Sequence, residues 1–282
     1  MVENRPFGTL LSHLVVLFGV LIVCFPVWIT FVAATHDQAA LLRPPIPLWP
    51  GSHFFENMET ILFAGVRSSR SAPVAVMLLN SLVMAVGIAV GKIAISIIAA
   101  YAIVYFHFPL RMVFFWMIFI TLMLPVEVRI LPTFEVVSNL NLLNNYGGLI
   151  IPLIASATAT FLFRQFFLSV PDELTEAARI DGAGPMRFFW DVLLPLSRNS
   201  IAALFVIQFI YGWNQYLWPL LITTEESYYT VVMGISRMLN VVDAAAEWNL
   251  VMATALLAML PPVVVVIAMQ RQFVRGLVET EK

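Results

Sequence analysis

The sequence predicts an all-α integral membrane protein, with six transmembrane helices that form a single domain over residues 1–282. Two observations lead to this fold class. Hydrophobic residues make up 61% of the chain and charged residues 11%, whereas soluble domains are roughly 45–50% apolar. The apolar residues also gather into six runs with few or no charges, each close to or above the roughly 20 residues that a helix needs to cross a bilayer.

The six expected spans follow one another along the whole chain, at 11–34, 73–105, 112–132, 146–168, 199–223 and 248–270. The first run has no Lys, Arg, Asp or Glu between Pro6 and His36. It is longer than the roughly 7–15 residues of a signal-peptide core, and no clear small-residue cleavage site follows it. We therefore expect a retained first helix.

Basic residues predict the orientation, because Lys and Arg in short loops prefer the cytoplasmic side of a membrane. With the N-terminus inside, the cytoplasmic segments and helix ends carry Arg5, Arg111, Arg164, Arg179, Arg187, Arg198, Arg271, Arg275 and Lys282. The outer loops then carry Arg43, Arg67, Arg70 and Arg237. We expect both termini and the polar segment 169–197 in the cytoplasm, and the long segments 36–72 and 224–247 outside.

The expected spans leave no room for a separate catalytic domain, because no remaining segment exceeds about 40 residues, near the size below which a core rarely stabilises itself. The nearest approach to a phosphate-binding loop runs from Gly87 to Lys92. It has one residue too few between its glycines and no Ser or Thr after the lysine. Gly87 and Gly91 instead form a small-xxx-small face that lets another helix approach closely. We expect no nucleotide or other cofactor on this chain, no catalytic activity, and an energy source on another chain.

Several other chemistries find no support in the sequence. Cys24 is the single cysteine, so neither a disulfide framework nor a multi-cysteine metal site can form. The basic residues are scattered rather than gathered into a patch, which argues against a nucleic-acid partner. No HExxH, GxSxG or paired aspartates suggest an intramembrane enzyme. Dispersed histidines argue against a metal site; they are His13, His36, His53 and His107.

The polar segment 169–197 predicts two short helices that lie across the cytoplasmic face. Pro171, followed by two carboxylates, marks a helix start. Gly182 can take the positive φ that ends a helix, and a second short helix would then end at Pro195. On spacing alone, a surface amphipathic helix is the simpler interpretation. The aromatic side chains expected in the membrane interface are Phe188, Phe189 and Trp190. The charged side chains expected to be exposed are Glu176, Arg179, Asp181 and Arg187.

A motif within this segment favours a more specific interpretation. It consists of Glu176-Ala177-Ala178, of Gly182 three residues past Arg179, and of Leu194-Pro195, with Val192 two residues before that leucine. The motif resembles the EAA loop of the permease subunits of bacterial ABC importers, which often has Ile in place of that valine. In that family the loop is a coupling helix that docks in a cleft of a cytoplasmic ATPase. The resemblance implies that the ATPase is contacted by Glu176, Ala177, Ala178, Arg179, Asp181 and Gly182. Small residues at 177 and 178 would allow close approach of the partner, and Glu176 would offer a charge-assisted contact.

The resemblance extends over essentially the whole chain. Residues 211–220 look like the fifth-span signature of carbohydrate-type importers, while 115–129 and 156–167 look like the branch of the family that serves import of sn-glycerol-3-phosphate. This implies the type I importer permease fold in a bacterial inner membrane. The implied partners are a paralogous permease subunit, an ATPase dimer that holds ATP and Mg, and a periplasmic substrate-binding protein. The substrate follows from the resemblance alone, so glycerophosphodiesters and other carbohydrates stay open.

Polar groups inside the expected spans are candidates for a substrate path. Lys92 could attract an anionic substrate, or it could snorkel or pair within the bundle. Arg129 offers a fork that suits phosphate, or it is an interfacial charge at a helix end. Asn214 and Gln215 either bond across helices or line the path. The aromatic residues around them fit a membrane-surface belt as well as a gate; they are Trp213, Tyr216 and Trp218.

The alternative from a different mechanism class is an ion-coupled secondary transporter. Such proteins usually have two related halves and broken helices around a midplane site, often with intramembrane carboxylates as proton relays. This chain shows no clear self-similarity and no Asp within its expected spans. Uptake by the chain alone in ATP-free vesicles would favour this alternative.

Overall fold

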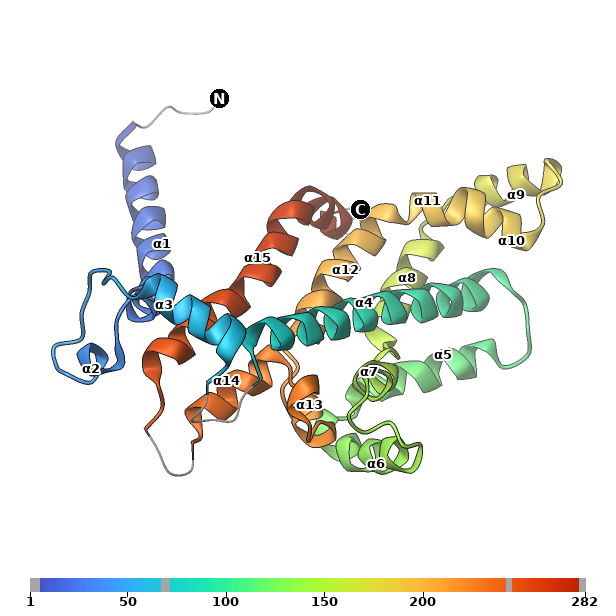
Figure 1. Ribbon diagram of the computed structural model, residues 1–282. Helices are drawn as coiled ribbons and strands as arrows, with labels where there is room; N and C mark the ends of the chain where they lie inside the picture. Colours follow the sequence, from blue (N-terminus) through green and yellow to red (C-terminus); the bar gives the residue numbers. More distant parts are fainter. Residues whose placement is uncertain (1–5, 67–71, 242–244, 279–282) are drawn as a thin grey trace. The chain divides into compact units, whose positions relative to one another are not determined.

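Every regular element is a helix in the part of the chain that the computed structural model describes, residues 6–66, 72–241 and 245–278 (Figure 1). The helices gather into two compact units. The first unit comprises Met1–Ala75 with Gly234–Leu260, and the second comprises Val76–Met233 with Pro261–Lys282. Three helices, α4, α14 and α15, have residues in both units.

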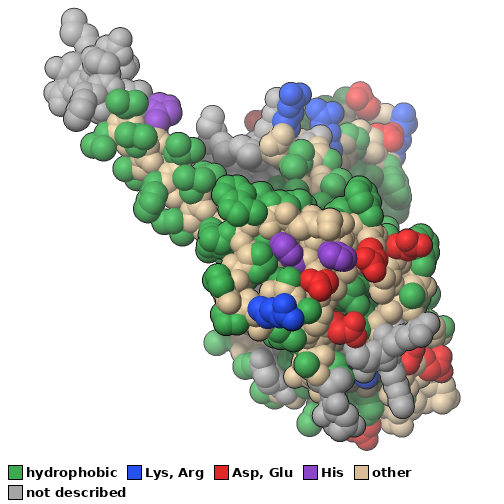
Figure 2. Space-filling model, turned by 60° about the vertical axis from the view of Figure 1, so that its left-hand side comes forward, with side chains coloured by type: hydrophobic (Ala, Val, Ile, Leu, Met, Phe, Trp, Pro, Cys, Tyr) green, Lys and Arg blue, Asp and Glu red, His purple; other side chains and the backbone are tan. Residues whose placement is uncertain are grey.

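The first unit begins with the long apolar helix α1, Pro6–Ala34. In the most apolar 18-residue stretch of this helix, only 6% of the residues are buried. Figure 2 shows hydrophobic side chains along the visible face of the helix. The segment that follows α1 carries charged and histidine side chains, among them Asp37, Arg43 and Glu56. That segment contains α2, Gln38–Leu41, α3, Phe54–Glu59, and the π-helical turn Thr60–Ala64. The chain thus changes from an apolar rod to a polar loop at the predicted end of the first span.

Buried side-chain hydrogen bonds hold this polar loop in the first unit. Asn57 donates from Nδ2 to the carbonyl oxygens of Ala34 and His36, both at 2.9 Å. Asn249, near the start of α15, donates from Nδ2 to Asn57 Oδ1 at 2.9 Å. Buried amides must find such partners to offset their lost hydration. Asn57 therefore fixes the end of α1, the following loop and the start of α15 to one another.

The second unit is built on α4, Val74–Tyr105, the longest helix of the part that the structure describes. The other elements of this unit with residues before 198 are α5 Arg111–Ile120, α6 Val126–Asn139, α7 Tyr146–Ile150, α8 Ala157–Leu168, α9 Asp172–Ile180, α10 Pro185–Phe188, η5 Phe189–Leu193 and α11 Leu194–Leu196. Short 3₁₀ turns lie at Thr121–Met123 and Ile151–Leu153. The remaining elements are α12 Arg198–Trp213, α13 Leu217–Ile222, η6 Glu226–Tyr228, α14 Val231–Leu239 and α15 Trp248–Val278.

Hydrogen bonds from the first turns of α4 position the segment before α14. Asn80 donates from Nδ2 to the carbonyl oxygens of Ser227 and Tyr229, at 2.7 and 3.0 Å. Tyr146 donates from its hydroxyl to Asn80 Oδ1 at 2.6 Å. Ser81 accepts at Oγ from the backbone N–H of Val231 at 2.8 Å. Two adjacent buried polar residues on one helix thereby satisfy backbone groups that would otherwise lie unpaired in an apolar region.

Gly87 and Gly91 lie where α4 comes closest to the α7–α8 region. A Cβ atom at Gly91 would lie 2.5 Å from Ile154 Cγ2, and one at Gly87 would lie 2.7 Å from Ile150 Cδ1. Both distances are shorter than van der Waals contact. The small-xxx-small spacing predicted from the sequence therefore stands at a close approach, which a larger side chain at either position would push apart.

The expected spans correspond to unbroken helices in three of six places. Leu10–Ala34, Val74–Tyr105 and Trp248–Arg271 are each long and apolar enough to cross a membrane. The expected span 146–168 is a bent pair, Tyr146–Leu153 and Ala157–Leu168, with 48° between its parts. The expected spans 112–132 and 199–223 are each interrupted, the former at residues 121–125 and the latter at 214–216. Six crossings therefore stay a prediction.

Candidate functional site

A cavity of about 490 Å³ brings together all four residues that the sequence proposed for a substrate path. Lys92 comes from α4, Arg129 from α6, and Asn214 and Gln215 from the break between α12 and α13. Residues of the α7–α8 connection complete the wall. The volume lies within the roughly 300–1,000 Å³ typical of small-molecule sites.

Lys92 is the buried cation of this cavity, with only 6% of its surface exposed. Its Nζ donates to Gln208 Oε1 at 3.1 Å and lies 3.6 Å from the centroid of the Tyr211 ring. Gln208 and Tyr211 are three residues apart on α12, so they share one face of that helix. The lysine therefore pairs within the bundle, and it also lines the cavity. Pairing within the bundle and lining a substrate path, the two roles that the sequence left open for Lys92, are therefore compatible.

Arg129 differs from Lys92 in that its side chain is exposed, although it lines the same cavity. Asn214 is also exposed, while Gln215 is partly buried and donates from Nε2 to the carbonyl oxygen of Tyr211 at 3.2 Å. Gln215 thus bonds within its own helix end. Its amide is fixed to the backbone of the last turn of α12, whose Tyr211 ring covers Lys92.

The aromatic residues near the helix break have different surroundings. Trp218 is buried and donates from Nε1 to the carbonyl oxygen of Gly148 at 3.0 Å. Trp213 is also buried, with its ring centroid 5.8 Å from that of Phe209 in a stacked arrangement. Neither lies at the surface of this chain, where a membrane-surface belt would place them. Tyr216 lines the cavity.

The cavity has a positive electrostatic character. Its lining includes the cations Lys92 and Arg129, and no Asp or Glu is among the described residues that line it. Thr133, Tyr211, Asn214 and Gln215 add neutral polar groups to the wall. Such a surface suits a small anion that also carries hydroxyl groups.

Sequence reasoning missed Gln208 and Tyr211, which determine how Lys92 is held. A signal was present, because Gln208 is an amide within the expected span 199–223, and hydrocarbon disfavours such a group unless it is bonded. Tyr211 gave no comparable signal, since a tyrosine near the end of a span is ordinary.

The polar segment contains the predicted helix start and turn. Helix α9 begins at Asp172, with two carboxylates in its first turn and Arg179 in its last, as the helix dipole favours. Gly182 has a φ of 72°. Its N–H donates to the carbonyl oxygen of Arg179 at 3.0 Å, and the N–H of Ala183 donates to that of Ala178 at 2.8 Å. This pair of bonds is a Schellman cap, and the left-handed conformation favours glycine.

The second helix of the segment runs farther than the sequence predicted. Residues Pro185–Leu196 are helical, with a π-helical turn at Phe189–Leu193, and Pro195 lies inside this run. The direction changes by 69° only beyond Leu196, before α12 begins at Arg198. The prediction that Pro195 ends the helix is wrong by one residue. Proline lacks the N–H that would bond to an earlier carbonyl oxygen, but its own fixed φ is helical, so Leu196 can still follow in the helix.

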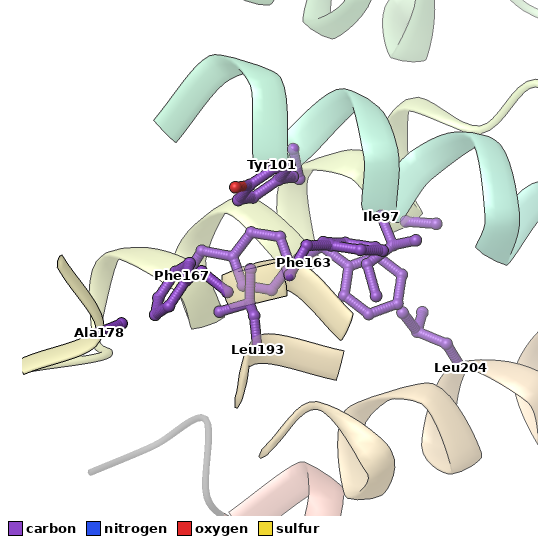
Figure 3. Packing of buried hydrophobic residues seen from close by; sticks show 11 residues of the cluster. Ile97, Tyr101, Phe163, Phe167, Ala178, Leu193 and Leu204 are labelled. Carbon is purple, nitrogen blue, oxygen red and sulfur yellow. The ribbon is translucent and has the colours of Figure 1, made fainter. Parts of the chain in front are cut away.

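The underside of the segment packs against its own chain. Ala178, Phe188 and Phe189 are buried in a cluster with residues of α4 and α8 (Figure 3). Tyr101 of α4 donates from its hydroxyl to the carbonyl oxygen of Pro185 at 2.7 Å. The expectation that Phe188 and Phe189 lie in the membrane interface is therefore wrong, since the protein core holds them. Trp190 is 59% exposed and remains available to an interface.

The opposite side of the segment is exposed. It presents Glu176, Ala177, Arg179, Asp181 and Gly182. Of the two alanines expected to face a partner, only Ala177 is exposed, while Ala178 is 9% exposed. The small size of Ala178 therefore serves the packing of this chain on itself.

A known protein family matches the part of the chain that holds both the cavity and the polar segment. Residues 92–279, which include the cavity and the polar segment, match the family described as the binding-protein-dependent transport system inner membrane component. The chain belongs to this family. The resemblance inferred from the EAA motif is thereby confirmed.

Full-length relatives are similar over 100% of both chains. The chain is 60% identical to the sn-glycerol-3-phosphate transport system permease protein UgpE of Yersinia pestis, and 59% identical to the protein of the same name from Escherichia coli O157:H7. A crystal structure of a bacterial ABC transporter involved in the import of the acidic polysaccharide alginate contains a chain of similar fold, with a TM-score of 0.80, 21% identity, and coverage of 97% of this chain and 98% of that one. The chain thus has the predicted all-α fold of an ABC importer permease and is a multi-pass membrane protein.

Proposed function

We propose that this chain is a transmembrane subunit of an ATP-driven importer of sn-glycerol-3-phosphate and forms half of its translocation path. The chain itself catalyses no reaction. A paralogous permease subunit forms the other half, a cytoplasmic ATPase dimer binds ATP and Mg, and a periplasmic binding protein delivers the substrate. Both termini lie in the cytoplasm, as does the exposed side of segment 169–197, which docks on the ATPase.

The positive cavity carries this proposal. A phosphate monoester has a charge of about −1.5 to −2 near pH 7, and the cavity lining has two cations but, among its described residues, no carboxylate. The names of the full-length relatives independently point to the same phosphate ester. A neutral sugar would bring no counter-charge to the two cations of this lining, whereas a phosphate ester would.

The proposal is tested by reconstituting the complete complex in proteoliposomes with its binding protein. We expect sn-glycerol-3-phosphate to stimulate ATP hydrolysis and to be taken up, and we expect vanadate to inhibit both. Maltose-like sugars serve as neutral controls and glycerophosphodiesters as singly charged ones. Stimulation by a neutral sugar but not by the phosphate ester would contradict the substrate. Uptake without ATP by this chain alone would contradict the mechanism and favour an ion-coupled transporter.

A further inference from the structure

The charge of Lys92 is held in place without being neutralised. A lysine is almost never fully buried unless it is paired, and the usual partner is a carboxylate. Here the two partners are the neutral Gln208 and the neutral ring of Tyr211. Among the described residues, Lys92 forms no ion pair with Asp or Glu. The side chain therefore presents its ammonium group, with no carboxylate beside it, to the cavity that it lines.

The ammonium group also retains hydrogen-bonding capacity. It has three N–H donors and no acceptor. Gln208 Oε1 accepts one of them, and the face of the Tyr211 ring attracts the charge without serving as a conventional acceptor. At least one donor is thus left for an oxygen atom in the cavity. Charge-assisted hydrogen bonds to such an oxygen are the strong ones.

Building on the proposed function, we propose that Lys92 is the phosphate-recognition group of the translocation path and that Gln208 is its positioning residue. Gln208 and Tyr211 fix the ammonium group while leaving it charged, so a phosphate oxygen can bind to it. Neutral partners suit a transporter, because they compete only weakly with a phosphate for the ammonium group and still hydrogen-bond to it once the substrate has left. A path must bind its solute favourably enough to admit it and weakly enough to release it.

This assignment chooses Lys92 over Arg129, the other cation that the sequence proposed for the substrate path. An arginine fork suits phosphate, but the Arg129 side chain is exposed and, among the described residues, no hydrogen bond holds its guanidinium group. An exposed cation acts mainly by attraction from a distance, which salt screens. A buried and oriented cation instead binds a particular oxygen atom of the solute at short range. Arg129 therefore attracts the anion to the cavity, and Lys92 binds its phosphate group there.

Gln208→Glu provides the sharpest test, since it changes the charge of the partner of Lys92 but hardly its size. The carboxylate would pair with the ammonium group and cancel the positive charge. We expect uptake of sn-glycerol-3-phosphate to fall by about tenfold or more, in line with the loss of one charge-assisted hydrogen bond. Uptake of a singly charged glycerophosphodiester should fall less. Gln208→Met, which keeps the length and leaves Lys92 without a carboxylate partner, should lower uptake of both solutes by less than Gln208→Glu does, and without changing the preference for the phosphate ester, since it removes one neutral acceptor but adds no charge.

Two further variants separate charge from structure. Gln270→Glu makes the same change on an exposed part of α15, and it should leave uptake unchanged. The double variant Lys92→Gln with Gln208→Lys moves the cation across the same 3.1 Å contact, and it should recover much of the preference for the phosphate ester that Lys92→Gln alone loses. Assembly of each complex is checked by co-purification of all subunits.

The proposal is overturned if the assembled Gln208→Glu complex transports the phosphate ester at the wild-type rate. It is equally overturned if Gln208→Glu and Gln208→Met lose uptake of both solutes to the same extent, because that is the behaviour of a structural residue. Failure of the wild-type complex to transport sn-glycerol-3-phosphate would instead contradict the proposed function. In that case, inorganic phosphate is added as an inhibitor while the complex takes up the solute that it does transport. Weaker inhibition in the Gln208→Glu complex than in the wild type would still show that Lys92 recognises phosphate, and equal inhibition would show that it does not.

Discussion

Two regions use charge in opposite ways: the cavity and the polar segment 169–197, here called the coupling segment for its proposed contact with the ATPase. In residues 169–197 the charged side chains are exposed and the apolar side faces the protein core. In the cavity the central cation, Lys92, is buried and oriented by neutral partners. Exposed charges can meet a large partner that arrives through water and covers them. A buried charge on a cavity wall can meet only a solute small enough to enter. The difference agrees with the proposed function, in which the coupling segment meets a protein partner and the cavity meets the transported molecule.

Reversing a charge on the exposed side of the coupling segment should have the largest effect. Glu176→Lys would place a cation where the resemblance implies a contact with the ATPase. We expect coupled uptake to fall by at least about tenfold, because breaking a charge contact that is buried on docking costs several kcal/mol. Co-purification of the ATPase and the ATP hydrolysed per solute imported measure this effect.

The matched control for that variant is Glu226→Lys, the same reversal on an exposed turn that the sequence places outside. It should keep the ATPase bound. A Glu176→Lys complex with normal assembly and coupling would count against a docking role for this face.

The two adjacent alanines should separate docking from folding. Ala178→Leu adds volume to the packed underside and should lower the stability of this chain by about 1–3 kcal/mol, as overpacking does. Ala177→Leu adds the same volume on the exposed side, so it should change stability by less than about 0.5 kcal/mol while weakening association with the ATPase. Thermal unfolding of the purified complex and co-purification of the ATPase distinguish the two. Equal destabilisation by both variants would show that the two faces are not distinct.

The smallest effect is expected from Arg129→Ala at the cavity. The side chain is exposed, so the loss should lower uptake by only about two- to fivefold, the range of a single solvent-exposed charge interaction. The effect should diminish as salt is added, because exposed charges are screened. Complex assembly should be intact. Unchanged transport kinetics at low salt would remove Arg129 from the substrate path.

The coupling segment was predictable because its signals are local. A proline with carboxylates marks the start of α9, and Gly182 marks its end, within a dozen residues of chain. The burial of Phe188 and Phe189 was not predictable, since the sequence does not reveal that α4 and α8 lie beneath them. An aromatic run beside a membrane span fits a lipid interface equally well.

The sequence predicted individual residues of the cavity but not the cavity itself. Its walls come from α4, α6, the α7–α8 connection and the α12–α13 break. A polar side chain in an apolar span can be recognised in the sequence, but its partner depends on packing between distant segments. Lys92 and Gln208 are 116 residues apart in the chain. The sequence therefore flagged Lys92, Arg129, Asn214 and Gln215 without indicating that they share one cavity.

The most direct test of this division of roles is thiol protection at one position in each region. Glu176→Cys and Asn214→Cys are made separately in a Cys24→Ser background, because Cys24 is exposed and would react. The rate of reaction with a maleimide is then measured in the complete complex and in the membrane subunits without the ATPase. We expect the ATPase to protect position 176 but not position 214, and sn-glycerol-3-phosphate with its binding protein to protect position 214 but not position 176. Protection of position 176 by the substrate alone, or no protection of it by the ATPase, would contradict the account.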